Sequence, residues 1–384
     1  MTKNSVINGV LVLVSICVAL IVVEAALRVF NIPEPLISGW RTPAEFPPIN
    51  QLGWRGQKTA YEPDDFVVVL VGDSNVECRI CPAEETTDVI LQRALRGLHP
   101  KARVVALGSA GFGTDQEYLA LQEYFSRHRA DLVLHWLTIN NDIWNNTFRT
   151  HGVTGKRARP KPTFWLEGGQ LRGPTEDIET RIDPAYTSRI VGLLDRVWHN
   201  PETAWATRLP PAGPGGTEPP QGTDATHRDS ELLETQQAHW SVWMRPRPAR
   251  VSYGIDLTRA LLDRMRDLAT RNKAHFALFH VDQLGPGAAR DPVRAGNPRE
   301  TRGTVAVGHR GHWYLADVAQ LQATVADVAR GFIFLSVPIT LEHSRVSARD
   351  GHLNLNGNRQ VLGDLARQVQ QSKLLENGLL ENRR

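Results

Sequence analysis

The sequence predicts an α/β protein with a five-stranded parallel sheet covered by helices on both faces and preceded by an N-terminal transmembrane helix. Two observations predict the sheet. Short runs of β-branched and other apolar residues are bounded by turn-forming residues, and they alternate with segments of helical apolar spacing. The third observation is a long uncharged run near the N-terminus, which predicts the membrane helix. The expected strands cover residues 65–72, 102–108, 130–139, 275–281 and 332–339.

The N-terminal run extends from Val6 to Val23 and contains no charged residue. As a helix it would span about 27 Å, which is enough to cross the hydrocarbon core of a bilayer. A cleaved signal peptide is the main alternative, because Val23 and Ala25 form a small-x-small pattern around Glu24. A buried N-terminal core helix is a third interpretation. The length of the run favours the uncleaved anchor.

Composition excludes several classes of protein. The 384-residue chain carries a net charge of +3, and its basic residues are scattered among acidic ones, so no nucleic-acid partner is expected. Three cysteines are too few for a disulfide scaffold, and Cys17 lies in the apolar run. Cys78 and Cys81 are not in a thioredoxin context, and two thiols do not complete a zinc site. The sequence leaves open whether they stay free thiols or, in an oxidising compartment, form a local disulfide that supports the chain after Ser74.

The chain divides into five regions. Residues 1–30 form the membrane anchor or signal segment, and the proline-rich residues 31–60 form an extended stem. An α/β domain follows over residues 61–376. An insertion rich in Pro, Gly and charge interrupts it at about 145–250, and its centre at 209–224 is expected to be a mobile loop. Residues 377–384 form a tail.

Helical spacing predicts the segments that connect the strands. Thr114 and Glu117 have the spacing of a capping box, with Thr114 as the N-cap of the second helix. The expected helices cover residues 84–98, 114–125, 256–272, 314–331 and 357–375.

Ligands of parallel sheets bind beyond the carboxyl ends of the strands, so the loops that follow each strand are the candidates for chemistry. One of them, residues 108–113, resembles a dinucleotide loop in position. Its glycines fall as G-x-x-G-x-G rather than G-x-G-x-x-G, which argues against nucleotide binding. The loops to examine are 72–75, 108–113, 140–142 and 347–358.

Together these loops predict a serine hydrolase site. Ser74 follows a strand and is a suitable nucleophile once a base removes its proton. Asp350 and His352 are two residues apart, so in an extended loop Asp350 can orient His352, and His352 can reach Ser74. Donors for the tetrahedral oxyanion would be the backbone N–H groups of Ser74 and Gly111 and the side-chain amide of Asn141. Each such donor is typically worth about 3 kcal/mol.

These motifs resemble the SGNH/GDSL hydrolase superfamily, whose four blocks contribute Ser, Gly, Asn and His in that order. The blocks correspond to Ser74, Gly111, Asn141 and His352, and the similarity covers residues 61 to about 375 apart from the insertion. The chain looks closest to the membrane-anchored bacterial branch, in which a stretch similar to "LGWRG" (52–56) precedes the domain. This resemblance implies a flavodoxin-like three-layer fold, an extracytoplasmic enzyme, and acyl-ester chemistry without a metal or organic cofactor.

Three positions depart from the family pattern. Ile139 replaces the usual glycine of the third block, which would narrow the pocket. Ala106 replaces an asparagine of the second block, so one supporting hydrogen bond is expected to be missing. The last block reads Asp-x-His rather than Asp-x-x-His, a spacing similar to that of polysaccharide O-acetyltransferases.

The sequence therefore favours a serine esterase that cleaves acyl esters, acetyl esters above all, on a carbohydrate or cell-envelope polysaccharide. The expected partners are an acylated carbohydrate or lipid substrate and the membrane. The body would lie outside the cytoplasm, on the periplasmic face of a bacterial inner membrane or at the cell surface. A polysaccharide O-acetyltransferase using the same site is one alternative, and a catalytically inactive, membrane-tethered carbohydrate-binding protein is another. No feature identifies a protein partner.

Several other residues have competing interpretations. His343 is the main competitor of His352 for the base, and His280 could line the pocket. "HRGHW" (309–313) is interpreted as a surface loop rather than a metal site. The tryptophans of the insertion could stack on sugar rings or simply pack the insertion down. They are Trp165, Trp198, Trp205, Trp240 and Trp243.

Overall fold

The computed structural model describes most of the domain and parts of the N-terminal region and insertion. The predicted loop centre at 209–224 and the tail at 377–384 lie outside the described residues. Those residues are 3–30, 37–38, 46–58, 60–148, 150–151, 159–175, 181–182, 188–198, 242–243, 247–282, 304–309, 312–339, 343–347 and 350–375.

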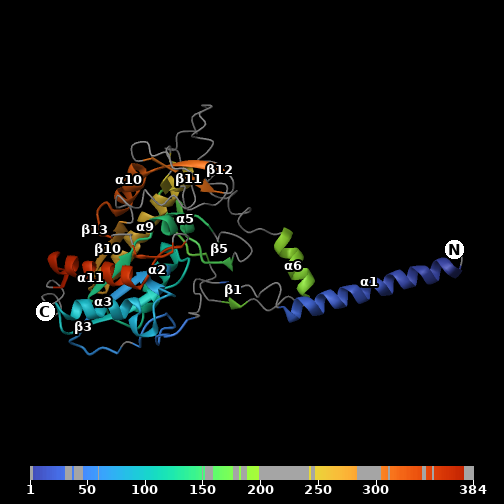
Figure 1. The fold of residues 1–384 in the computed structure, drawn as a ribbon, viewed down its shortest axis with the longest axis horizontal. Coiled ribbons are helices and arrows are strands. Elements are labelled where there is room, and N and C mark those ends of the chain that lie inside the picture. The colour runs from blue at the N-terminus through green and yellow to red at the C-terminus, as the bar shows by residue number, and fades with distance from the viewer. Residues whose placement is uncertain are drawn as a thin grey trace.

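A five-stranded, all-parallel sheet forms the centre of the domain (Figure 1). The strand order is β13-β10-β4-β2-β3, which is the flavodoxin-like order because the first strand lies between the second and the third. All seven residues of β2 are buried, as expected for a parallel strand covered on both faces. The strands are β2 (Phe66–Gly72), β3 (Ala102–Gly108), β4 (Leu132–Trp136), β10 (His275–Asp282) and β13 (Ile333–Pro338). The predicted fold class is confirmed.

Helices cover the two faces of this sheet and enclose separate apolar clusters. One cluster joins the sheet to α3 (Thr87–Arg96) and α11 (Leu355–Gln371). The other cluster joins the opposite face to four helices. These are α4 (Thr114–Phe125), α5 (Ile139–Asn146), α9 (Ala249–Arg271) and α10 (Val318–Ala329). The result is a three-layer sandwich.

Two local predictions are wrong. Helix α10 begins at Val318 rather than at 314, because residues 314–317 belong to β12 (His312–Asp317), which pairs with β11 (Thr304–His309). The sequence "HRGHW", expected to be a surface loop, therefore includes the ends of a hairpin, and His309 pairs with His312. The apolar residues of β12 also fit a helical period, so only the partner strand decides between the two structures.

Thr114 is likewise not the N-cap of α4. Gly113 occupies that position, and Thr114 is the first helical residue. Asn146 on α5 accepts a hydrogen bond from the Asp115 backbone N–H at 3.1 Å. A side chain distant in sequence thus satisfies the helix end that the capping box was expected to satisfy.

The N-terminal helix α1 (Lys3–Val29) extends away from the domain in Figure 1. Within its residues 4–29, an 18-residue window has a mean hydropathy of 3.0, and none of that window is buried in the protein, so by length and composition the helix is a candidate membrane anchor or signal sequence. A short helix, α6 (Arg189–Trp198), lies against its C-terminal part. A two-residue strand, β1 (Ile37–Ser38), follows α1 in the chain and pairs with β9 (Arg181–Ile182).

The first part of the insertion is attached to the domain core. Lys161 is buried and its Nζ contacts Asp115 Oδ2 at 2.5 Å, while Phe164 packs edge-on against Tyr118. The regular structure here consists of the pairs β5 (Thr150–His151) with β6 (Arg159–Pro160) and β7 (Trp165–Glu167) with β8 (Gln170–Arg172). A last pair, β14 (Arg345–Ser347) with β15 (Asp350–Leu353), precedes α11.

Candidate active site

Ser74 lies at the carboxyl end of β2, as the first residue of the one-turn helix α2 (Ser74–Glu77). The turn that presents it is close-packed. A Cβ on Gly72 would come within 2.7 Å of Val76 Cγ2, and one on Gly108 within 2.6 Å of Val76 Cβ. Glycine at both strand ends therefore lets α2 fold back onto the sheet. Ser74 remains half-buried and reachable from solvent.

His352 is the partner of Ser74. Its Nε2 lies 2.9 Å from Ser74 Oγ, across 278 positions of sequence. Asn354, the N-cap of α11, fixes the end of β15, the strand that carries His352. The Asn354 side chain accepts from Gly357 N at 3.0 Å and donates to the carbonyls of His343 and Arg345 at 2.8 and 2.9 Å. The predicted nucleophile and base are thus adjacent.

The competing base, His343, is an exposed residue with positive φ. Its backbone carbonyl accepts a hydrogen bond from Asn354 Nδ2 at 2.8 Å. The third predicted member, Asp350, is the first residue of β15, two positions before His352. Alternate positions of a strand share a face. The side chain of Asp350 lies outside what the structure describes.

Asp73 is fully buried directly beneath the nucleophile. One carboxylate oxygen accepts from Asn75 N at 2.9 Å, and the other accepts from Asn141 Nδ2 at 2.6 Å. Burial raises the pKa of Asp73, and these hydrogen bonds together with the nearby His352 oppose the rise. Asp73 therefore joins the start of α2 to the start of α5.

Asn141 is positioned by the first turn of α5. Thr138 is the N-cap residue of this helix, and its N–H donates to Asp142 Oδ2 at 2.7 Å. The amide of Asn75 also reaches Thr138 Oγ1, at 3.1 Å. Because an amide nitrogen carries two hydrogens, Asn141 can donate one to Asp73 and keep a second donor for another acceptor.

The loop after β3 carries the predicted Gly111, which has a φ of +75° that a side chain would strain. Two contacts hold this loop. Ala110 N donates to Glu77 Oε2 at 2.6 Å, and Asn145 Nδ2 donates to the Gly111 carbonyl at 3.1 Å. Glu77 is 2% exposed and lies at the end of α2. The sequence analysis missed Glu77, although its place three residues after Ser74 made it a candidate for supporting the site.

Cys78 and Cys81, whose pairing the sequence leaves open, form a disulfide immediately after α2. The buried Arg55 of "LGWRG" clamps the same turn. Its guanidinium donates to the carbonyls of Glu77, Cys78 and Cys81 at 3.1, 2.5 and 2.6 Å. Asn358 of α11 contacts Cys78 Sγ at 3.4 Å. Through Arg55, the stem therefore contacts the turn that directly follows Ser74 and α2.

Two of the departures from the family pattern have a structural explanation. Ile139 is 3% exposed and belongs to the apolar cluster beneath α5, so it packs into the core instead of narrowing the pocket. At Ala106, Asn50 of the stem supplies a hydrogen bond, with its Nδ2 3.3 Å from the Ala106 carbonyl. An asparagine therefore does reach this strand, from a different part of the chain.

A fully buried polar cluster lies between the sheet and helices α4 and α5. Glu117 Oε2 lies 2.6 Å from His135 Nε2, and the ligand atoms of Glu117, His135 and Asp142 are within 4.8 Å of one another. Burial raises the pKa of Glu117 and Asp142 well above the usual range, and nearby carboxylates, Asp73 among them, add to the rise. Burial lowers the pKa of His135 to about 3. The sequence analysis did not single out these residues.

The remaining candidates lie apart from the Ser74–His352 pair or outside the description. Trp243 Nε1 donates to Asn140 Oδ1 at 3.1 Å, which places this end of the insertion beside Asn141. Trp165 is half-buried in β7. His280 faces a hollow beside α10 and β13, and its Nδ1 lies 3.0 Å from the Leu137 carbonyl. Trp205, Trp240 and the side chain of Trp198 lie outside the described part of the chain.

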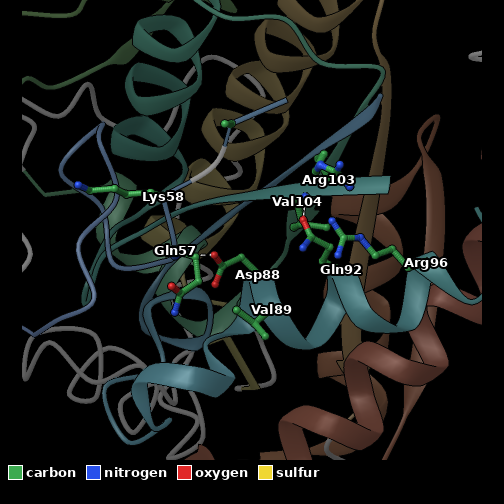
Figure 2. A pocket seen from close by; sticks show the side chains of 9 residues that line it. Gln57, Lys58, Asp88, Val89, Gln92, Arg96, Arg103 and Val104 are labelled. Carbon is green, nitrogen blue, oxygen red and sulfur yellow. Dashed lines mark hydrogen bonds between the residues drawn. The ribbon is translucent and has the colours of Figure 1, made fainter. Parts of the chain in front are cut away.

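A second hollow lies beside α3 and the end of the stem (Figure 2). Gln57 N donates to Asp88 Oδ2 at 2.8 Å, and Val104 N donates to Gln92 Oε1 at 3.1 Å. Neither Ser74 nor His352 lines it. The first contact attaches the stem to α3, and the second joins β3 to α3.

Comparisons with known proteins find similarity to solved structures alone. No family model and no curated protein matches the chain. Among solved structures, one of a proposed arylesterase from Agrobacterium tumefaciens is similar over 80% of this chain and 99% of that chain. The sequence identity is 16% and the TM-score is 0.30.

Proposed function

We propose that the protein is a serine esterase of the SGNH type that cleaves acyl esters, acetyl esters above all, on a carbohydrate or cell-envelope polysaccharide. The observation that carries the proposal is the 2.9 Å contact between Ser74 Oγ and His352 Nε2 at the carboxyl end of a parallel sheet. This is the hydrogen-bond geometry that a nucleophile and its general base require.

In the proposed reaction, His352 Nε2 takes the proton of Ser74 Oγ while Oγ forms a bond to the acyl carbon. Asp350 orients the imidazole from two positions away on β15. The carbonyl oxygen becomes an oxyanion, which the N–H groups of Ser74 and Gly111 and the free amide hydrogen of Asn141 would stabilise. The intermediate then collapses, and the leaving alcohol takes the proton from His352. Water repeats the sequence on the acyl-enzyme and releases the acid.

The fixed positions of the donors support this assignment. Asn141 is held by Asp73 at 2.6 Å, and the Gly111 loop is held by Asn145 and, through Ala110, by Glu77. Donors that do not have to reorient during the reaction stabilise developing charge most effectively.

The experiment uses the full chain in lipid nanodiscs with p-nitrophenyl acetate and with acetylated polysaccharide. Ser74→Ala and His352→Gln should each lower kcat at least about a thousandfold, because members of such a unit act together. His343→Gln is the matched control and should keep near-wild-type kcat. A fluorophosphonate should add its mass to the peptide that contains Ser74. Wild-type turnover by Ser74→Ala would remove the proposal.

The same assay separates hydrolysis from acyl transfer. The Asp-x-His spacing favours O-acetyl transfer as the second candidate. Addition of a deacetylated oligosaccharide should leave acetate as the main product if water is the acceptor. Acetylated oligosaccharide as the main product would instead assign the transferase activity. Binding of polysaccharide without either product would favour the inactive, carbohydrate-binding alternative.

For localisation, we propose that α1 is retained as a membrane anchor and that the domain lies outside the cytoplasm. The Cys78–Cys81 disulfide supports an oxidising compartment. Glu24 supports retention, because its carboxylate bonds to residues 188–190 and cleavage after Ala25 would remove it. The intact mass of the chain extracted from membranes is the test. A chain that begins at Ala26 would contradict the anchor.

A further inference from the structure

Helix α6 begins at a carboxylate that belongs to α1. The backbone N–H groups of Arg189 and Ile190 donate to Glu24 at 2.9 and 3.0 Å, and Ser188 Oγ donates to it at 3.0 Å. Ser188 Oγ also accepts from Val191 N at 3.3 Å, as an N-cap does. The first N–H groups of a helix have no partner within it, so a carboxylate here stabilises the helix start. Glu24 therefore fixes the N-terminus of α6 to α1.

The position of Glu24 sets the depth of that contact. It follows Val23, the last residue of the uncharged run, and it pairs with Arg28 one turn later. In a helix that crosses a bilayer, the first charged residues after the apolar run lie at the boundary between hydrocarbon and headgroups. The start of α6 is thus held at this boundary.

The sequence of α6 is amphipathic. In "RIVGLLDRVW" the apolar positions fall on one side of the helix, and the charged positions 189, 195 and 196 fall on the other. The apolar side is open. Val191 is 56% exposed, Leu193 39% and Leu194 45%. Within the described part of the chain, these side chains are left largely uncovered.

The direction of α6 fits a position in the plane of the membrane. In Figure 1 it crosses α1 steeply near the C-terminal end of that helix, on the side of the catalytic domain. Membrane-spanning helices are usually tilted by only about 20° from the bilayer normal. A helix that crosses α1 steeply at this level therefore runs near the bilayer surface.

We infer that α6 is an interfacial helix whose apolar face lies in the headgroup–acyl boundary of the membrane that α1 crosses. The inference rests on the proposed anchor. Lipid, rather than another protein, is the occupant because the open face of α6 adjoins the exposed apolar surface of α1 at the depth set by Glu24. Charged positions opposite an apolar face are typical of helices that bind lipid surfaces.

This arrangement gives the insertion a defined role. Residues 145–250 contain α6, and their first part is attached to the domain through Lys161 and Phe164. The domain thus has two attachments to the membrane, α1 and α6. A second attachment restricts rotation about α1 and holds the opening near Ser74 at a fixed height above the lipid.

Site-directed spin labelling of the full chain tests the inference. In a Cys17→Ser background, a nitroxide is placed at Val191→Cys or Leu194→Cys, and at Arg196→Cys as the matched control on the opposite side. Nanodiscs contain phosphatidylcholine and phosphatidylglycerol. The ratio of oxygen to nickel-chelate accessibility, which reports immersion in lipid, should be several-fold higher at 191 and 194 than at 196.

Further outcomes separate the alternatives. Equal, water-like ratios at all three positions would overturn the inference, and so would protection of 191 and 194 from both reagents, which would indicate a protein partner. Glu24→Ala should reduce the difference between positions 194 and 196, whereas Leu13→Ala, within the apolar run, should not. A label at native Cys17 reports the anchor. If Cys17 is immersed while 191 and 194 are in water, only this inference fails; if Cys17 is not immersed, the anchor fails as well.

Discussion

Two acidic residues, Asp73 and Glu77, lie on either side of Ser74 in the sequence and fix other residues of the candidate site. Asp73 fixes Asn141, and Glu77 fixes the loop of Gly111 through Ala110. Both carboxylates are buried and use backbone N–H or amide donors. Two of the side-chain supports of the predicted oxyanion donors thus come from the same five-residue stretch that presents Ser74, and the third is Asn145.

At this scale we predict that Glu77→Gln lowers kcat about tenfold with little change in KM. The reason is that a hydrogen bond to a charged group is typically worth about 1.5 to 3 kcal/mol, and the Ala110 contact positions a donor that acts in the transition state. Turnover of p-nitrophenyl acetate measures it. Glu84→Gln, an exposed position seven residues later, is the control. An unchanged kcat in Glu77→Gln would show that the loop is positioned without it.

At the scale of elements, three separate interactions hold the turn after α2. These are the Cys78–Cys81 disulfide, the Arg55 guanidinium on three carbonyls, and the contact of Asn358 with Cys78. These three interactions join the stem, the helix α2 that begins at Ser74, and α11, which follows the strand β15 that carries His352. The stem is therefore part of the domain core at Arg55 and not merely an extended spacer.

We predict that Cys78→Ser with Cys81→Ser lowers the free energy of unfolding by about 2 kcal/mol, the chain-entropy value for so short a loop. Activity should persist, because Arg55 still holds the turn. Urea unfolding of the full chain in detergent measures the loss. Cys17→Ser, which removes an exposed cysteine of α1, should leave the midpoint unchanged. Loss of activity with an unchanged midpoint would mean that the disulfide positions Ser74 rather than stabilises the fold.

At the scale of the whole molecule, the buried cluster of Glu117, His135 and Asp142 links stability to pH. A carboxyl whose folded pKa is raised stabilises the fold below its unfolded pKa, and this contribution is lost as pH rises through the folded pKa. For Glu117 the loss begins above its ordinary value of 4.5. His135 acts in the opposite direction, because its pKa falls from 6.5 to about 3, so its contribution is lost as pH falls through that window.

We therefore predict that the stability of Glu117→Gln relative to wild type increases as pH rises above about 4.5 toward 8, since the amide never ionises. Urea midpoints at several pH values measure this difference, with exposed Glu84→Gln as the control. A difference that is independent of pH would show that the pKa of Glu117 is the same in the folded and the unfolded protein.

Much of the fold and part of the site could be predicted because their signals are local in the chain. Runs such as 65–72 are continuous apolar strands, and the loops after them carry Ser74, Asn141 and His352. The strand at 312–317 was missed because its partner, 304–309, determines it. Glu77 and Arg55 were missed because single charged residues have no periodicity.

The sequence by itself determined the order of the five sheet strands, the apolar N-terminal segment and the candidates for nucleophile and base. These depend on patterns among neighbouring residues. Only the tertiary structure decided that His352 rather than His343 contacts Ser74, that Asn50 reaches Ala106, and that Glu24 begins α6. Each of these contacts joins residues far apart in the chain. The physical reason is that hydrogen bonds depend on distance in space, which the packing of helices on the sheet sets and the order of residues does not.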